Sequence, residues 1–293
     1  MSERVTGAVY VALSASGFGA MAIFAKFAYQ AGADVVAIGL LRFALAAALM
    51  TGLMLVRPRR WPRGRNLALL ILMGGVGYVA QSYSFFSALN YASAALVALL
   101  LYLHPFMVTV AGALLMGQRL TRVRIACVSA ALVGTALIIG ADVSGQPAGI
   151  ALGVLAAVIY AAYLLVGSRV LASEDTLAAA SVVMLSAAAG YALVALIEAP
   201  AFPQSIGGWV AVGSIAVLST SVAMVLLFAG IKRLGAADAA TLSTLEPLVT
   251  AVLAAFLLGE QITLLQGLGG AIILLAGIAL VRFGERDAND AAQ

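Results

Sequence analysis

The sequence predicts an all-α integral membrane protein with ten transmembrane helices in two inverted five-helix repeats. Three observations lead to this prediction: an apolar composition, long unbroken apolar runs, and a pattern that recurs at a fixed spacing. The 293 residues are 64% hydrophobic and 10% charged, whereas a soluble domain is roughly 45–50% apolar and 25% charged. A bilayer core requires about 20 apolar residues per helix, so this composition is typical of a multi-pass membrane protein.

The apolar runs between clusters of charged and turn-forming residues define the predicted helices in order. They cover residues 5–29, 35–56, 66–88, 93–116, 122–140, 147–170, 176–198, 208–230, 236–258 and 262–282. The runs are continuously apolar and rich in Ala, Leu and Gly, which favours helices over the alternating strands of a transmembrane barrel. The first run is long, has only Arg4 ahead of it and resembles a later run, so we expect it to be retained rather than cleaved as a signal peptide.

Basic residues mark one side of the predicted membrane protein. With the N-terminus in the cytoplasm, 14 of the 16 Lys and Arg residues fall on the cytoplasmic side, and the loops of the other side contain none. By the positive-inside rule, both termini are predicted to be cytoplasmic. The net charge of +4 is thus a topology signal, and no nucleic-acid partner is expected. The basic inner face fits a bacterial inner (plasma) membrane.

A short pattern recurs 142 residues further along the chain. The segment MGQRLT at 116–121 reappears as LGEQIT at 258–263, and the segment LHP at 103–105 reappears as LEP at 245–247. The starts of the two halves also align at this offset. Each half therefore contains five spans, and because five is odd, the second half enters the membrane in the opposite sense. The predicted units are residues 1–141, residues 142–284 and a cytoplasmic tail, 285–293.

These residues resemble the drug/metabolite transporter superfamily and its paired EamA domains. The resemblance rests on two five-helix units, each with a glycine-rich first helix, a fourth helix that carries a proline, and then the G-[EQ]-x-[LI]-[TS] turn. It implies a ten-helix carrier of small metabolites, often an exporter, with a central cavity between the halves. The second copy has the familiar Glu246 and Pro247. The first has His104 before Pro105, so the resemblance implies no acidic role there.

Two prolines are predicted to interrupt the fourth helix of each half near the membrane midplane. A proline removes its own amide donor and clashes with the carbonyl four residues earlier, so Pro105 is expected to free the carbonyl of Leu101, and Pro247 that of Ser243. Matching interruptions in two halves indicate a substrate site. His104 and Glu246 would then face a cavity, where they bind a polar group or carry a proton. The alternative is a hydrogen-bonded core histidine and a protonated, buried Glu246.

Helical spacing predicts which other side chains line this cavity. Residues three and four apart share one face, which groups Ser243 with Glu246, Tyr78 with Ser82, and Tyr160 with Tyr163. At the repeat offset the two tyrosines of the last pair correspond to Phe18 and Met21. Aromatic rings with hydroxyl tips would suit an amphipathic ligand, although packing or interface roles would account for the tyrosines equally. Tyr102 lies two residues before His104, so it is not expected to share its face on an unbroken helix.

Two basic residues fall inside or near spans. Lys26 could attract a carboxylate at the cavity mouth, although snorkelling of its ammonium to the interface is the favoured interpretation. Arg42 lies about 10 Å into its span at the helical rise, and it is expected to form a structural ion pair with Asp34.

Other classes of function fit the sequence less well. A serine protease would require a G-x-S-x-G elbow and a metalloprotease HExxH, and neither occurs; one histidine cannot build a zinc site, so neither enzyme activity nor a metal is expected. No ATP-binding domain or cofactor motif is present. A channel is left open as an alternative, but the sequence lacks the repeated ring of charge or the filter-like loop that a channel would require. The favoured function is export of amino acids, preferably aromatic or large neutral, because exporters of aromatic amino acids exist in the superfamily that this chain resembles. Efflux of cationic drugs is the alternative, and the oligomeric state is left open.

Overall fold

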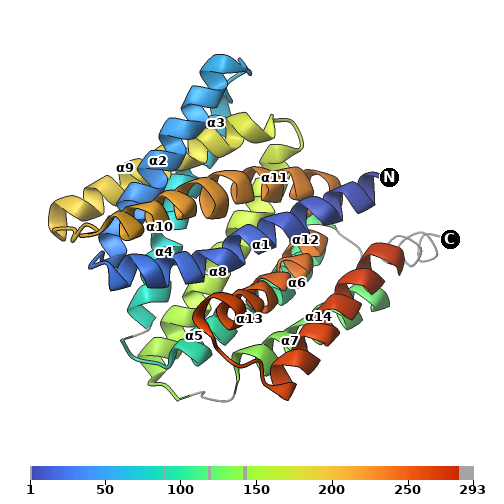
Figure 1. The fold of residues 1–293 in the computed structure, drawn as a ribbon. Helices are drawn as coiled ribbons and strands as arrows, with labels where there is room; N and C mark the ends of the chain where they lie inside the picture. The colour runs from blue at the N-terminus through green and yellow to red at the C-terminus, as the bar shows by residue number, and fades with distance from the viewer. Residues whose placement is uncertain (1, 89, 118–119, 141–143, 284–293) are drawn as a thin grey trace.

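The computed structural model describes residues 2–88, 90–117, 120–140 and 144–283, and all named elements in these residues are helices (Figure 1). Ten segments in the described residues are long and apolar enough to cross a membrane. They are Glu3–Gln30, Val35–Val56, Gly64–Phe85, Leu96–Met116, Arg122–Ile139, Pro147–Leu171, Thr176–Ile197, Ile206–Leu234, Ala236–Leu258 and Leu264–Phe283. Each overlaps one predicted segment, so the all-α membrane fold with ten spans is confirmed.

Four of the spans are not continuous α-helices. The elements in order are α1 (Glu3–Gln30), α2 (Val35–Val56), α3 (Gly64–Leu72), η1 (Met73–Tyr78), α4 (Val79–Ala88), α5 (Ala94–Leu101), α6 (His104–Met116), α7 (Arg122–Ile139), α8 (Pro147–Leu171), α9 (Thr176–Ile197), α10 (Ile206–Ala216), η2 (Val217–Val222), α11 (Ala223–Leu234), α12 (Ala236–Leu242), α13 (Leu245–Leu258) and α14 (Leu264–Phe283). The third and eighth spans contain the π-helical turns η1 and η2. The fourth and ninth are broken, between α5 and α6 and between α12 and α13.

The recurring glycine motif ends the second part of each broken span. Gly117 follows α6 with φ of +64°, and Gly259 follows α13 with φ of +70°. A glycine in this left-handed conformation is a common way to end a helix, because it lacks the Cβ that would clash there. The G-[EQ]-x-[LI]-[TS] motif therefore includes a helix stop in both halves.

Close helix pairs hold the body together (Figure 1). The helices α7 and α14 lie side by side, and α1 packs against α10, α11 and α13. A Cβ at Gly134 in α7 would lie only 2.7 Å from the carbonyl oxygen of Gly269 in α14. Small residues at such crossings let two backbones approach, which allows the van der Waals packing that contributes to helix association in lipid.

The two ends of the molecule differ in how they are closed. At the end where α1 begins and α14 finishes, which we call the terminal end, Asp238 in α12 is 2% exposed and pairs with Arg4 and Arg124. The Arg4 Nη2–Asp238 Oδ2 distance is 2.8 Å and the Arg124 Nε–Asp238 Oδ1 distance is 3.0 Å. Arg4 also donates to the carbonyl oxygen of Leu280, 2.8 Å away. These bonds tie α1, α7, α12 and α14 together.

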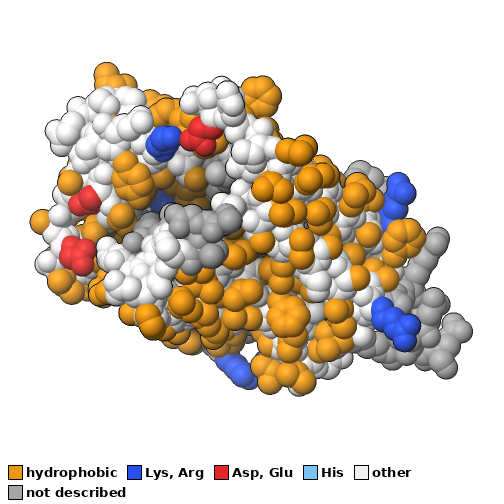
Figure 2. All heavy atoms as spheres, turned by 90° about the horizontal axis from the view of Figure 1, so that it is seen from below, with side chains coloured by type: hydrophobic (Ala, Val, Ile, Leu, Met, Phe, Trp, Pro, Cys, Tyr) orange, Lys and Arg blue, Asp and Glu red, His pale blue; other side chains and the backbone are white. Residues whose placement is uncertain are grey.

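The opposite end, which we call the far end, is hollowed. There the Asp34 carboxylate accepts hydrogen bonds from the amides of Ala37 and Ala201, at 2.7 and 2.8 Å. A pocket of about 430 Å³ opens between α2, α4 and α9, and its wall includes Val79, Tyr191 and Glu198. Figure 2 shows a hollow at one end with both acidic and basic side chains around it, while apolar side chains cover much of the remaining face.

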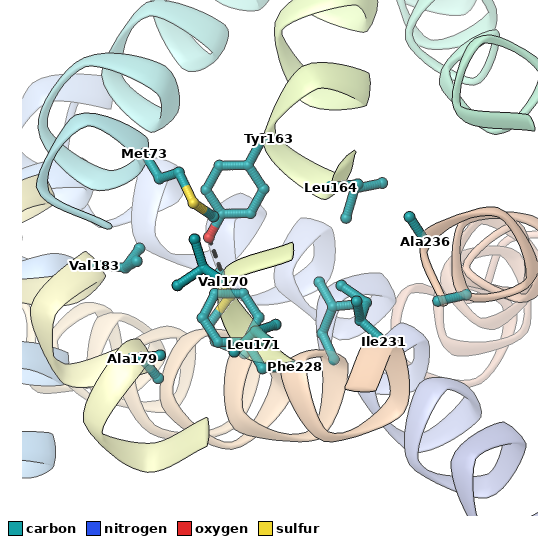
Figure 3. Packing of buried hydrophobic residues seen from close by; sticks show 14 of the residues in the cluster. Met73, Tyr163, Leu164, Val170, Leu171, Ala179, Val183, Phe228, Ile231 and Ala236 are labelled. Carbon is teal, nitrogen blue, oxygen red and sulfur yellow. Dashed lines mark hydrogen bonds between the residues drawn. The ribbon is translucent and has the colours of Figure 1, made fainter. Parts of the chain in front are cut away.

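The buried core centres on α8, α9 and α11. Figure 3 shows Tyr163 of α8 beside Met73, with Phe228 of α11 and Val183 of α9 around it. The Tyr163 hydroxyl donates to the Met224 sulfur at 3.5 Å, so this buried tyrosine has a polar partner. The core therefore leads directly to the aromatic residues of the candidate site.

Candidate functional site

Both predicted helix interruptions are present. Between α5 and α6 the chain leaves the helix at Tyr102 and Leu103, and between α12 and α13 it does so at Ser243 and Thr244. Pro105 lies in the first turn of α6, where a proline is tolerated because its missing N–H has no helical acceptor. The breaks bring His104 and Glu246 to equivalent positions at the start of α6 and α13.

The carbonyl freed at the first break is contacted by His104 itself. The Nδ1 atom of His104 lies 3.0 Å from the carbonyl oxygen of Leu101. Because a carbonyl can only accept, Nδ1 carries the hydrogen, and Nε2 of the neutral ring is then an acceptor. His104 is 2% exposed, and Nε2 has no hydrogen-bond partner among the described residues. A ligand with an N–H or O–H group would satisfy it.

The second break also uses its own backbone. The amide of Glu246 donates to the carbonyl oxygen of Ser243 at 3.0 Å, and the Ser243 hydroxyl donates to Ala239 at 2.9 Å. The expectation that the prolines leave the carbonyls of Leu101 and Ser243 free is therefore wrong, because nearby donors in the same broken segments contact both. The breaks therefore contribute the side chains of His104 and Glu246 to the site, and not carbonyl groups without a hydrogen-bond donor.

Glu246 is held close to α1 and has no basic partner. Thr250 donates to the carbonyl oxygens of Gly19 and Glu246, at 2.9 and 3.1 Å, and a Cβ at Gly19 would lie 2.7 Å from the latter atom. The side chain of Glu246 is half-buried, and it makes no ion pair within the described residues. An acidic group at this depth is a strong indicator of function.

Tyr102 is part of the site, contrary to the expectation that it faces elsewhere. Its hydroxyl lies within hydrogen-bonding reach of the Glu246 carboxyl group, and its ring centroid is 6.1 Å from that of His104. The expectation assumed an unbroken helix. Because α5 ends at Leu101, the angle between Tyr102 and His104 is set by the break and not by helical spacing.

A row of aromatic rings extends from this charged position through the interior. His104 and Tyr160 have ring centroids 4.5 Å apart, Tyr160 and Tyr163 are 6.3 Å apart, and Tyr163 and Tyr78 are 5.9 Å apart. Tyr78 then packs edge-on against Phe43, with centroids 4.9 Å apart. These separations are typical of favourable ring contacts. The structure thus brings Tyr78, His104, Tyr160 and Tyr163 together from the third, fourth and sixth spans.

Arg42 reaches the other end of this row. It donates to the Met21 sulfur and the Tyr78 hydroxyl, both at 2.9 Å, and its guanidinium lies 4.3 Å from the Phe43 ring centre. The expected ion pair with Asp34 is wrong, because that carboxylate caps the first turn of α2 instead. Met21 therefore joins the site as a partner of Arg42.

The remaining predicted residues lie at the margins. Lys26 pairs with Glu260 at 3.2 Å where both side chains are about half exposed, and no hydrogen bond, ion pair or cation–π contact joins Lys26 to the aromatic row within the described residues. Ser82 is buried one turn after Tyr78, and Phe18 packs at the edge of the core that contains Tyr163. Arg42 and Tyr102 are the two site residues that the helical spacing missed; the unmatched charge of Arg42 was the available signal for the first.

One family model matches both halves of the chain. Residues 5–140 and 147–283 each match the EamA-like transporter family. Two proteins of Bacillus subtilis (strain 168) are similar: the uncharacterized transporter YcbK is 29% identical, over 94% of this chain and 93% of that protein, and the uncharacterized transporter YyaM is 24% identical, over 80% of each. A solved crystal structure with 21% identity has a TM-score of 0.81 over 94% of this chain and 96% of the other, so its fold is the same.

Proposed function

Because this chain belongs to the EamA-like transporter family, we propose that it is a secondary carrier that exports amino acids, preferably aromatic or large neutral ones. Membership of the family and of the drug/metabolite transporter superfamily makes it a multi-pass membrane transporter, and favours transport over catalysis. We further propose that transport follows an alternating-access mechanism in the export direction. We also propose that the two repeats are inverted, that both termini are cytoplasmic and that the protein lies in a bacterial inner membrane.

One observation supports the substrate class above the others. Glu246, without an ion-pair partner in the described residues, lies at one end of a row of aromatic rings that starts with His104 and Tyr160. A carboxylate can bind an ammonium group, and aromatic faces bind an apolar or aromatic side chain at short range. The acceptor Nε2 of His104 offers a second contact for the same ammonium.

Efflux of cationic drugs remains the alternative, because Glu246 is equally suited to a bulky organic cation. The two functions predict different competitors. Purified protein in liposomes should exchange labelled for unlabelled phenylalanine, and tryptophan, tyrosine and leucine should compete more strongly than a quaternary ammonium drug. Stronger competition by the drug would favour the alternative. No exchange, in liposomes shown to contain folded protein, would contradict the amino-acid substrate.

A further inference from the structure

The guanidinium of Arg42 is a positive charge inside a membrane span with no acidic partner in the described residues. Its two hydrogen-bond acceptors, the Met21 sulfur and the Tyr78 hydroxyl, are both neutral. The Phe43 and Tyr78 rings lie 4.3 and 5.3 Å from the guanidinium carbon. Ring faces stabilise a cation, but they do not neutralise it. A charged residue at this depth is costly unless it is paired or faces water.

Arg42 also has donors to spare. One N–H is donated to Met21 and one to Tyr78, and the Nε atom is buried without a hydrogen-bond partner among the described residues. A guanidinium presents its N–H groups as a planar fork that matches a carboxylate in two parallel hydrogen bonds. The two existing bonds hold the fork in a fixed orientation and leave N–H groups available for an anion.

The far-end pocket is a neighbour of this position, although Arg42, Phe43 and Tyr78 are not themselves in its wall. Its wall includes Tyr191, whose ring stacks on Phe43 at a centroid distance of 5.3 Å, and Val79, the residue after Tyr78. The three spans that form the pocket therefore also hold Arg42 and its two ring contacts. The pocket volume of about 430 Å³ lies within the range of roughly 300–1,000 Å³ that is usual for small-molecule sites.

We propose that Arg42 binds the carboxylate of the transported molecule from the far-end pocket. This step is separate from binding of the ammonium by Glu246, because the two groups of an α-amino acid are on one carbon atom while Arg42 and Glu246 lie at opposite ends of the ring row. This inference rests on the proposed function and narrows it: the substrate carries a carboxylate, and an organic cation without one is a poor substrate. Glu198 in the pocket wall favours a zwitterion over a dianion, because its negative charge repels a phosphate group more strongly than an amino acid of zero net charge.

The test compares ligands that share a phenyl ring and differ in their charged groups. Thermal stabilisation of the purified protein in detergent would be titrated with phenylalanine, phenylalaninamide, phenethylamine, phenylacetate and phenyl phosphate, for the wild type and for Arg42→Gln, Arg42→Lys and Arg122→Gln. Arg122 is an exposed arginine at the start of α7 and controls for loss of one positive charge. Arg42→Gln should weaken the apparent affinity for phenylalanine about tenfold to a hundredfold, the weight of a charge-assisted hydrogen-bonded pair.

The other variants and ligands sharpen the result. Arg42→Lys keeps the charge but loses the fork, so it should recover the affinity only in part, while phenethylamine should bind all the variants alike. Equal phenylalanine affinity in the wild type and Arg42→Gln would overturn the inference, as would tighter binding of phenyl phosphate than of any carboxylate. If phenylalanine is not transported but phenylacetate binds in an Arg42-dependent manner, the amino-acid function fails while the carboxylate site stands. If the wild type and Arg42→Gln transport phenylalanine equally well, the amino-acid function stands while the carboxylate site at Arg42 fails.

Discussion

Asp238 and the pair of Arg42 and Glu246 are charged positions inside the same helical body, but their charges are compensated differently. Asp238 at the terminal end is 2% exposed and bonded to two arginines from α1 and α7. Neither Arg42 nor Glu246 makes an ion pair within the described residues, and both are half-buried. A matched cluster is suited to closing one end of the protein, whereas unmatched charges beside aromatic rings are suited to a ligand.

Closing the terminal end with Asp238 should contribute most to stability. Asp238→Asn removes the negative charge but leaves two arginines packed against it, so we expect a loss of about 3–5 kcal/mol, the usual cost of removing one partner of a buried ion pair. Chemical unfolding in mild detergent would measure it. The double variant Asp238→Asn with Arg4→Gln should recover part of the loss. A single variant as stable as the wild type would show that the cluster does not hold this end.

Glu246→Gln should reduce transport and leave stability unchanged, the opposite of what is expected for Asp238→Asn. Because Glu246 has no ion-pair partner among the described residues, the free energy of unfolding should be unchanged. Phenylalanine exchange should fall at least about tenfold, which corresponds to about 1.4 kcal/mol. Wild-type exchange should decline as the pH is lowered, since protonation removes the negative charge that binds an ammonium.

The pH profile requires a control because other titratable groups lie close by. His104 and the hydroxyls of Tyr102 and Tyr160 neighbour Glu246. His104→Asn should therefore be measured in parallel, and it should retain the decline that Glu246→Gln loses. Retention of the wild-type profile by Glu246→Gln would assign the pH dependence to another group.

The ring row should contribute a smaller, substrate-specific effect. Tyr160→Ala removes the ring that lies 4.5 Å from His104, and an aromatic pair is worth about 0.5–1.5 kcal/mol beyond buried area. We expect the KM for phenylalanine to rise roughly twofold to tenfold, with little change in the KM for alanine. Tyr160→Phe keeps the ring and should behave like the wild type. An equal rise for both substrates would indicate a general packing defect.

The exposed pair of Lys26 and Glu260 should have the smallest effect. Both side chains are about half exposed, and such pairs contribute about 0–1 kcal/mol. Lys26→Gln should change the free energy of unfolding by no more than about 1 kcal/mol. Phenylalanine exchange should lose any dependence on salt concentration that the ion pair confers. A loss of transport comparable to that of Glu246→Gln would return Lys26 to the substrate site.

The sequence was sufficient for the spans but only partly for the site. Length, apolarity and the two prolines specify the ten spans and both breaks, because these depend on composition along the chain. The directions in which side chains point around each helix were predicted less well. Spacing rules assume a continuous helix, so Tyr102 was assigned to the wrong face, and Arg42 was paired with Asp34 because the two are close in sequence. The partners of Arg42 come from α1 and η1, which no local pattern in α2 reveals.

The π-helical turn η1 ends at Tyr78, the residue that receives the Arg42 hydrogen bond. Such a turn accommodates an extra residue, and one residue corresponds to about 100° of rotation in a regular helix. Winding the same residues as a regular α-helix would therefore turn Tyr78 away from Arg42 without altering either side chain. The site is specified by the winding of this span as well as by the identity of its residues. A related chain one residue shorter here would keep the same side chains on the site only if a regular α-helical turn replaced the π turn.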